Sequence, residues 1–236
     1  MPVAIVTGSS RGIGRAIAER LARDGFDLFV VARDTKALEE VARVITALGR
    51  RAVSCATDLA EREAPQAVFQ AFSESFSRLD VLVNNAGVAT LSPFEEHTEA
   101  DWDFVMNLNA RTPFFLTQLV LPLLKQADPG YVVNIGSVMS TKGYARQSLY
   151  AASKHALLGF TKSLARETTG ANIRVHAILP GSVNTRLLTS LKPEIDTSDL
   201  ISTEEIADVV SNLVRMRGNA IIDAIEVRRR STQPWG

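Results

Sequence analysis

Six short runs rich in β-branched and other apolar residues alternate along the chain with longer segments of helical periodicity. The runs predict strands at residues 3–7, 28–31, 52–56, 81–83, 131–135 and 174–178. The segments between them predict helices at residues 13–24, 35–48, 61–76, 101–125 and 148–168. Such alternation is typical of a parallel sheet with helices on both faces. We therefore predict a three-layer, doubly wound α/β fold with a mainly parallel sheet of about seven strands.

Local signals define some of the later elements. The sequence S-T-E-E that starts at Ser202 has the form of a capping box and predicts a helix that runs to about Met216. Pro113 and Pro122 predict kinks or an early stop in the fourth helix. Residues 185–202, rich in Pro, Thr, Ser and Asp, predict a mobile loop over the functional site.

Composition and charge narrow the classes of function. A chain of 236 residues, 46% of them hydrophobic, buries a core large enough for one domain over residues 1–236. The 26 basic and 26 acidic residues cancel, so no net field attracts nucleic acid or an anionic membrane. No apolar stretch spans a bilayer and no basic leader precedes the first strand, so we expect a cytoplasmic protein. A single cysteine, Cys55, and three histidines without metal-ligand spacing exclude an internal disulfide and predict no metal.

A glycine-rich turn, T-G-S-S-R-G-I-G at residues 7–14, separates the first predicted strand from the first predicted helix. In α/β proteins such a turn places a helix N-terminus under a pyrophosphate, because glycines let the backbone approach the ligand. The spacing is G-x-x-x-G-x-G instead of the G-x-G-x-x-G of the common dinucleotide fingerprint. A second interpretation stays open, in which Gly8 serves only the turn while Gly12 and Gly14 serve only close packing.

The end of the second predicted strand bears on the choice of dinucleotide. An acidic residue there favours a free ribose 2′-hydroxyl, whereas an arginine accommodates a 2′-phosphate. Ala32 takes the place of the acid, Arg33 follows it, and Arg11 lies in the glycine turn. We therefore expect NADP(H) in preference to NAD(H). The alternative is a solvated Arg33 paired with Asp34.

Ser137, Tyr150 and Lys154 suggest proton-transfer chemistry. Ser137 follows a predicted central strand, where ligands bind in open α/β sheets. Tyr150 and Lys154 lie four residues apart on a predicted helix, so both side chains leave the same face. A neighbouring ammonium lowers the pKa of a tyrosine, so Tyr150 would exchange a proton with a carbonyl or alcohol oxygen that Ser137 also hydrogen-bonds. The alternative is a structural tyrosine beside a solvated amine.

In their order along the chain, these motifs resemble those of the short-chain dehydrogenase/reductase family in its single-domain form. The resemblance covers about residues 3–215. The matching motifs are T-G-x-x-x-G-x-G at residues 7–14, Asp58-Leu59, N-N-A-G at residues 84–87, Ser137, Y-x-x-x-K at residues 150–154 and P-G-S-V-N-T at residues 180–185. The resemblance implies a Rossmann-like fold and an NADP(H)-dependent oxidoreductase. Such an enzyme transfers a hydride between the nicotinamide and a ketone or secondary alcohol, as carbonyl reductases and alcohol dehydrogenases do.

The resemblance also implies roles for single residues. It adds an asparagine to the catalytic group, and the family pattern around residues 106–115 selects Asn109 over Asn107. The implied catalytic residues are Asn109, Ser137, Tyr150 and Lys154. The implied cofactor-binding residues are Gly8, Ser10, Arg11, Gly12, Ile13, Gly14, Arg33, Asp58, Leu59, Asn85, Ala86, Gly87, Tyr150, Lys154, Pro180, Gly181, Val183 and Thr185. For Asp58, Leu59, residues 85–87 and residues 180–185 the alternative is a turn or strand-end role in the sheet.

The residues expected to face the substrate are mostly apolar, which favours a medium-sized apolar ketone or diketone. They are residues 91–94, Met139, Tyr144 and residues 187–200. A second interpretation is a 3-oxoacyl carrier-protein reductase, with Arg146, Lys142 and Arg186 as a basic surface for the carrier. A third, from another class, is an NADPH-sensing protein that carries out no chemistry.

The C-terminal residues depart from the family pattern. The family usually ends in a strand followed by V-D-G-G, whereas residues 221–227 here lead into three arginines, Arg228 to Arg230. We interpret this run as a solvated tail or an interface strip of salt bridges, not as a nucleic-acid site. Family dimers pair the two long helices, residues 101–125 and 148–168, so we expect a homodimer or a homotetramer.

Overall fold

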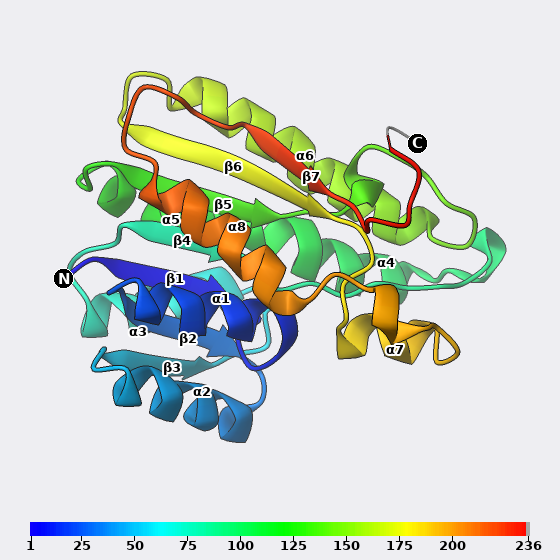
Figure 1. The fold of residues 1–236 in the computed structure, drawn as a ribbon, viewed down its shortest axis with the longest axis horizontal. Coiled ribbons are helices and arrows are strands. Elements are labelled where there is room, and N and C mark those ends of the chain that lie inside the picture. The colour runs from blue at the N-terminus through cyan, green and yellow to red at the C-terminus, as the bar shows by residue number, and fades with distance from the viewer. Residues whose placement is uncertain (235–236) are drawn as a thin grey trace.

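The computed structural model describes residues 1–234 and arranges seven strands within them in one sheet, in the order β3-β2-β1-β4-β5-β6-β7 (Figure 1). The strands are β1 (Val3–Thr7), β2 (Asp27–Ala32), β3 (Ala52–Ala56), β4 (Val81–Asn84), β5 (Gly130–Ile135), β6 (Ile173–Pro180) and β7 (Ala224–Val227). Every neighbouring pair is parallel, so the predicted doubly wound α/β fold is confirmed. The last residues of the predicted domain, Trp235 and Gly236, lie outside the described residues.

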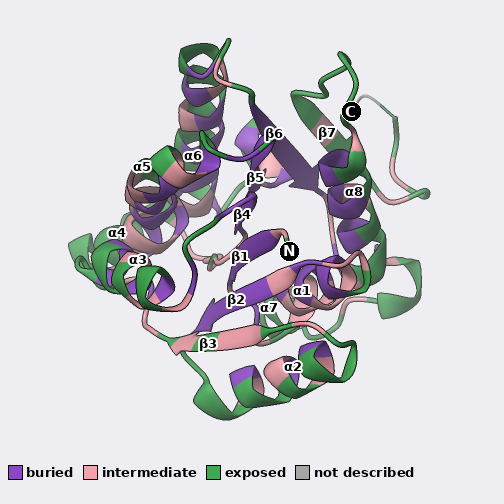
Figure 2. Ribbon diagram, turned by 90° about the vertical axis from the view of Figure 1, so that its left-hand side faces the viewer, coloured by how far each residue is buried: buried purple, intermediate pink, exposed green. Residues whose placement is uncertain are grey.

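Helices cover both faces of the sheet. They are α1 (Gly12–Arg23), α2 (Thr35–Ala47), α3 (Ala64–Ser75), α4 (Glu99–Met106), α5 (Thr112–Leu124), α6 (Ser148–Glu167), α7 (Arg186–Leu191) and α8 (Thr203–Arg215). Figure 2 shows α1, α2 and α8 on one face and α3, α4, α5 and α6 on the other. The capping box predicted at the start of α8 is present. No helix in residues 1–234 combines the length and apolar character needed to cross a bilayer.

Strand β1 shows how the chain fills both layers. Ala4 and Val6 lie in the core cluster under α1, α2 and α8, whereas Val3 and Ile5 lie in the cluster under α3 and α5. This alternation follows from the two-residue period of a strand. Because both faces are covered, β1 is buried along its whole length and has an unbroken apolar sequence. Polar groups therefore gather where the strands end.

The long helix predicted at residues 101–125 is divided into α4, a π-helical turn at Asn107–Arg111, and α5. At the end of the turn, the amide of Thr112 donates to the carbonyl five residues earlier instead of four. Pro113 contributes to this arrangement, because it has no amide hydrogen to complete the ordinary helical pattern. The kink predicted at Pro113 is thus a π turn, while Pro122 lies inside α5 without ending it.

The stretch at residues 185–202 has more structure than the predicted loop. It contains α7 and a 3-10 turn at Thr197–Asp199, and Ile201 forms a β-bridge with Val183. Its polar residues act as caps, since the side chain of Thr185 accepts a hydrogen bond at the start of α7. The mobility of this stretch stays a prediction.

Candidate active site

Two adjoining cavities open at the carboxyl ends of the strands. The first, of about 440 Å³, is lined by the glycine turn and by residues that follow β2, β3 and β4. The second, of about 550 Å³, is lined by residues that follow β5 and β6, by α7 and by the C-terminal segment. Ile13, Gly136, Tyr150 and Leu187 belong to the walls of both cavities. Ligands bind at this edge of open α/β sheets, so the two cavities form the candidate active site.

The glycine turn both forms a tightly packed junction between β1 and α1 and borders the first cavity, which are the two roles that the sequence left open. Gly8 has a φ of 66°, a left-handed conformation that favours glycine. A Cβ at Gly14 would lie 2.3 Å from the carbonyl oxygen of Gly8, so Gly14 serves close packing. The N-cap residue of α1, Arg11, makes no capping hydrogen bond through its side chain, and no acidic residue lies in the first turn. The N-terminus of α1 therefore faces the first cavity with amide donors and a positive dipole end that suit an anion.

Asn85 joins the ends of two neighbouring strands. Its Nδ2 donates to the carbonyls of Thr7, at 2.9 Å, and Gly8, at 3.3 Å. In return, the Oγ1 of Thr7 accepts from the amides of Asn85 and Ala86, at 3.0 and 3.1 Å. The side chain of Asn85 thus holds β1 against β4, which is the strand-end role considered as the alternative to cofactor binding. Residues 85–87 also line the first cavity.

Arg33 and Asp58 lie at the far end of the first cavity. The guanidinium of Arg33 is 3.4 Å from Asp58, and the two side chains are 60% and 38% exposed. Asp34 does not pair with Arg33, because its carboxylate caps α2 by accepting from the amide of Ala37 at 3.1 Å. Exposed ion pairs are weak, so Arg33 can exchange Asp58 for a phosphate at little cost.

The structure brings most of the predicted cofactor residues to the first cavity. Those that line it are Gly8, Ser10, Arg11, Gly12, Ile13, Gly14, Arg33, Asp58, Leu59, Asn85, Ala86, Gly87, Tyr150, Lys154 and Thr185. Pro180, Gly181 and Val183 line the second cavity instead. The sequence analysis did not assign several further lining residues to the cofactor: Ala32, Asp34, Thr57, Leu108, Ile135, Gly136, Arg186 and Leu187. Most of these residues are sequence neighbours of the motifs. They could have been identified from the register of the sheet, which places the ends of neighbouring strands side by side.

Ser137, Tyr150 and Lys154 meet where the two cavities join. Ser137, which follows β5, lines the second cavity together with Tyr150. The Nζ of Lys154 donates to the carbonyl of Ile135 at 2.8 Å and lies 5.8 Å from the centre of the Tyr150 ring. Lys154 is only 4% exposed, so the fold, not solvent, holds this amine beside the tyrosine.

Burial sets the protonation of this group. It raises the pKa of the Tyr150 phenol above its ordinary value, and the hydrogen bond with Ser137 opposes that rise only in part. Burial also lowers the pKa of Lys154 to about 8. The pKa of Tyr150 in the chain by itself is therefore raised and not lowered as expected, because loss of hydration is the largest cause of the shift. Tyr150 is a protonated phenol at neutral pH.

Asn109 lies in the π-helical turn and is fully buried. Its amide nitrogen donates to the carbonyl of Val88, at 2.8 Å, and to the hydroxyl of Ser153, at 2.9 Å, while its oxygen accepts from the amide of Val88 at 2.9 Å. Ser153 in turn donates to the backbone carbonyl of Tyr150 at 2.7 Å. A Cβ at Gly87 would contact both the Asn109 oxygen and the Lys154 amine, at 3.2 and 3.5 Å. Asn109 thus lies beside Lys154 but lines neither cavity.

The second cavity contains only part of the predicted substrate-facing set. The members that line it are Met139, Tyr144, Leu187, Leu188, Leu191 and Lys192. Residues 91–94 do not, because this segment packs on the loop before α6: the amide of Ser92 donates to a backbone carbonyl there at 2.9 Å. Of the three basic residues proposed to bind a carrier protein, Lys142 lines the second cavity, Arg186 lines the first, and Arg146 lines neither.

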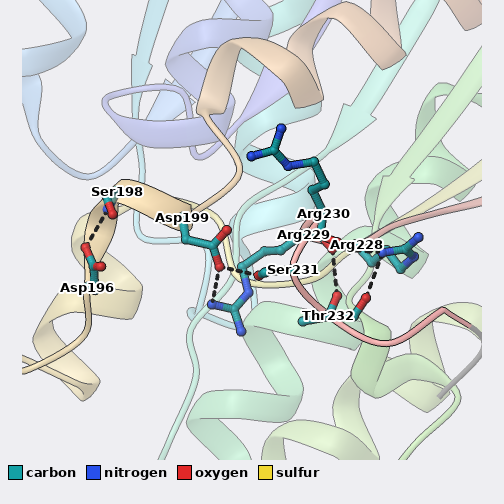
Figure 3. A network of polar contacts seen from close by, with 8 residues as sticks. All are labelled: Asp196, Ser198, Asp199, Arg228, Arg229, Arg230, Ser231 and Thr232. Carbon is teal, nitrogen blue, oxygen red and sulfur yellow. Dashed lines mark hydrogen bonds and ion pairs between the residues drawn. The ribbon is translucent and has the colours of Figure 1, made fainter.

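The C-terminal segment adds lining residues that the sequence analysis missed. Glu226, Arg228, Arg229, Thr232 and Gln233 line the second cavity. Residues 221–227 supply β7, which pairs in parallel with β6, so the chain beyond β7 emerges at the carboxyl edge of the sheet. Two of the three arginines, Arg228 and Arg229, therefore belong to the cavity wall, and Figure 3 shows them beside Arg230. The sequence signal that could have placed these residues is the apolar run at 221–227, which contains β7. The register of β7 with β6 fixes where the residues after Val227 lie.

Comparison with known proteins identifies the family. The short chain dehydrogenase family model matches residues 2–196. The chain belongs to the short-chain dehydrogenase family. This short-chain dehydrogenase is therefore an oxidoreductase of a family that acts on CH–OH and C=O groups of small molecules.

Relatives and solved structures of this short-chain dehydrogenase span most of its length. It is 36% identical over 197 residues to the 2-dehydro-3-deoxy-D-gluconate 5-dehydrogenase of Dickeya dadantii, with 83% of this chain and 77% of the relative covered. It is 35% identical over 198 residues to the 3-oxoacyl-(acyl-carrier-protein) reductase FabG of Vibrio cholerae, covering 84% and 80%. A metagenomic short-chain oxidoreductase in complex with NADP superposes with a TM-score of 0.84 at 34% identity, covering 97% of this chain and 96% of the other.

Proposed function

We propose that this short-chain dehydrogenase is an NADP(H)-dependent oxidoreductase that interconverts ketones and secondary alcohols, as a carbonyl reductase or alcohol dehydrogenase does. The observation that carries the proposal is the meeting of Ser137, Tyr150 and Lys154 at the junction of two cavities. One cavity suits a dinucleotide, and the other suits a carbonyl compound. The NADP complex of the metagenomic relative supports the choice of cofactor.

The first cavity fits a phosphorylated dinucleotide. The uncapped N-terminus of α1 would hold the pyrophosphate, and Arg33 with Arg11 would hold the 2′-phosphate. Asp58 and Leu59 would border the adenine, and Lys154 would bond the ribose beside the nicotinamide. When bound, the nicotinamide supplies or accepts the hydride. The residues after β6, from Pro180 to Thr185, would flank that ring from the second cavity.

The chain contributes proton transfer and orientation. In the reductive direction the hydroxyls of Ser137 and Tyr150 hydrogen-bond the carbonyl oxygen of the substrate. As the carbon gains a hydrogen and the C=O π bond breaks, the oxygen takes the electron pair and receives the proton of Tyr150, which leaves an alcohol and a phenolate. The Lys154 ammonium stabilises that phenolate, since its pKa of about 8 keeps it mainly charged at neutral pH. Asn109 is a positioning residue, because its bonds to Val88 and Ser153 hold the helix that carries both groups.

The second candidate function is reduction of a 3-oxoacyl carrier-protein thioester. It is favoured by the similarity to the Vibrio cholerae reductase and by the basic residues of the second cavity. An NADPH-sensing protein without chemistry is the remaining alternative, and it would need no proton donor beside the cofactor.

Loss of NADPH absorbance across a carbonyl panel tests the proposal. The panel holds diketones, aryl ketones and an acetoacetyl thioester, and the best substrate decides between the two enzymatic functions. Tyr150→Phe should lower kcat about 10²- to 10⁴-fold, because it removes the proton donor and keeps the ring. Tyr131→Phe is the control, since that hydroxyl bonds the carbonyl of Met216 at 2.7 Å, outside both cavities. Full activity in Tyr150→Phe, or NADPH binding without any reduction by the unsubstituted protein, would refute the proposal.

A further inference from the structure

The outer wall of the second cavity carries an excess of positive charge. Its charged residues are four cations and one carboxylate: Lys142, Lys192, Arg228, Arg229 and Glu226. Two of the cations have acidic partners, since Lys142 lies 3.6 Å from Glu226 and Arg229 lies 3.4 Å from Asp199. Among residues 1–234, no ion pair forms at Lys192 or Arg228. These two side chains therefore leave positive charge on the cavity wall.

Arg228 is held in place by backbone carbonyls instead of an acid. Its Nη1 donates to the carbonyls of Thr232 at 2.8 Å, Arg229 at 3.1 Å and Arg230 at 3.4 Å, and Figure 3 shows the contact with Thr232. A guanidinium has five N–H donors, and Nε and Nη2 of Arg228 have no acceptor within the described chain. A fixed guanidinium with unused donors on a cavity wall is suited to a carboxylate, which it binds through two parallel hydrogen bonds.

The sheet register sets how far Arg228 lies from the reacting group. Val227 pairs with Pro180 on the neighbouring strand, and the amide of Gly181 donates to the carbonyl of Val227 at 2.7 Å. Ser137 follows β5, on the other side of β6. Two strand spacings separate the Arg228 backbone from Ser137, or about 10 Å. Arg228 and Ser137 line the same cavity, so an anion a few bonds from a carbonyl bound at Ser137 would lie in the space that Arg228 borders.

We propose that the substrate carries a carboxylate or similar small anion a few bonds from its reacting carbonyl, and that Arg228 binds this anion. Lys192 adds to the attraction without a direct role in orientation. The proposal rests on the proposed function and names the substrate class for it. It replaces the expectation of a medium-sized apolar ketone or diketone, which took no account of the cations that the C-terminal segment adds to the cavity wall.

Binding of matched acids and esters tests the proposal without any turnover. Acetoacetate and levulinate are titrated calorimetrically into the protein with NADP⁺ bound, each beside its methyl ester, which removes the charge. We expect the better acid to bind about 10- to 150-fold more tightly than its ester, the range of one charge-assisted hydrogen bond. Equal dissociation constants for acid and ester in both pairs would overturn the proposal.

Three substitutions locate the preference. Arg228→Gln should reduce the acid-to-ester ratio to about one, and Lys192→Gln should reduce it in part. Lys192 makes no side-chain hydrogen bond within residues 1–234, so its replacement does not unseat the C-terminal segment even if Arg228→Gln does. Arg230→Gln is the matched control, because its side chain extends away from Arg229 (Figure 3) and does not line this cavity. A loss in Arg230→Gln as large as in Arg228→Gln would mean that general charge is responsible and would refute the site.

A parallel turnover assay separates this proposal from the proposed function. If acids bind more tightly but NADPH reduces no compound, the anion site stands and the reductase function fails. If acids and esters are reduced equally well, the function stands and the anion site fails. Acetoacetyl-coenzyme A and the neutral acetoacetyl thioester of N-acetylcysteamine complete the panel. A preference for the coenzyme A ester that disappears in Arg228→Gln would assign Arg228 to a carrier phosphate and overturn the small-anion proposal.

Discussion

The side-chain amine of Lys154 is buried in the protein and has lost its hydration. It is 4% exposed and donates to one carbonyl, and burial lowers its pKa from 10.5 to about 8. The unfolded chain keeps the higher value, so between these two pH values the unfolded state binds more protons than the folded state. Stability therefore rises with pH across that window. Below about pH 8 the buried charge costs the fold about 3 kcal/mol.

We predict that Lys154→Met stabilises the protein at neutral pH, because it removes the buried charge and keeps the volume. The free energy of unfolding should rise by about 1–3 kcal/mol near pH 7. At about pH 9.5 Lys154 is mostly deprotonated in the folded state, so the unsubstituted protein no longer buries the charge. The difference in the free energy of unfolding between the two proteins should then be about 2 kcal/mol smaller. Urea titrations of both proteins at both pH values measure the difference. An advantage that does not change with pH would contradict the lowered pKa of Lys154.

Arg33 is expected to determine the choice of dinucleotide. It is exposed and its pair with Asp58 is weak, so its contribution should appear only when a 2′-phosphate is present. Arg33→Ser should reduce the ratio of NADPH to NADH affinity about 10- to 150-fold, as measured by fluorescence titration of each cofactor. Arg23→Ser is the control, since Arg23 lies at the opposite end of α1. An unchanged ratio in Arg33→Ser would show that another residue selects the cofactor.

At the scale of the element, two helical glycines illustrate opposite effects of one methyl group. In α1, a Cβ at Gly14 would meet the Gly8 carbonyl at 2.3 Å, so Gly14→Ala should cost about 1–3 kcal/mol or more. In α6, Gly159 is exposed and a Cβ there meets nothing within 4 Å, so Gly159→Ala should gain about 0.5–1 kcal/mol. For a chain of this length, each kcal/mol moves Tm by about 2–4 °C in a thermal melt. Melting shifts of the same sign in both variants would contradict the packing shown by the structure.

The strands and most helices could be predicted from sequence because their signal is local. Apolar periodicity fixes α1 and β1, and the capping box at Ser202 fixes the start of α8. The π turn at Asn107–Arg111 could not be predicted, since it depends on which carbonyl each amide selects once a proline removes one donor. Asn109 was placed only through the family pattern.

The residues of the candidate site also divide into those that could be predicted from the sequence and those that could not. The residues of the glycine turn, Tyr150 and Lys154 come from contiguous motifs, and the structure brings them together. Arg228 could not be assigned, because its position depends on β7 pairing with β6 across more than forty residues of sequence. The direction of the Tyr150 pKa shift also escaped prediction, since desolvation depends on packing that no spacing reveals.

At the scale of the whole molecule, an aromatic group on α5 and α6 suggests how copies of the chain associate. Phe114 is 43% exposed, and its ring lies 5.2 Å from Phe115 and 5.1 Å from Phe160 between centres. We propose that this surface, on the two long helices, forms the interface of at least a homodimer. An exposed aromatic cluster is more stable when a partner covers it.

Light scattering should give a mass at least twice the 25.7 kDa of one chain. Phe114→Glu should shift that mass toward one chain, because it places a charge in the proposed interface. Phe94→Glu should leave the mass unchanged, since Phe94 is 78% exposed in a 3-10 turn that is not part of α5 or α6. A monomer mass for the unsubstituted protein would rule out the interface.

The N-terminus and the last described residues lie at opposite edges of the sheet. The N-terminus precedes β1 at the amino edge, far from both cavities, whereas Thr232 and Gln233 line the second cavity (Figure 1). A purification tag fused after Gly236 would be joined to the chain three residues after Gln233, which lines the second cavity, whereas one fused before Met1 would be joined at the other edge of the sheet. Substrate preference measured with a C-terminal tag would therefore differ from that of an N-terminally tagged protein, and removal of the C-terminal tag by a protease should restore it.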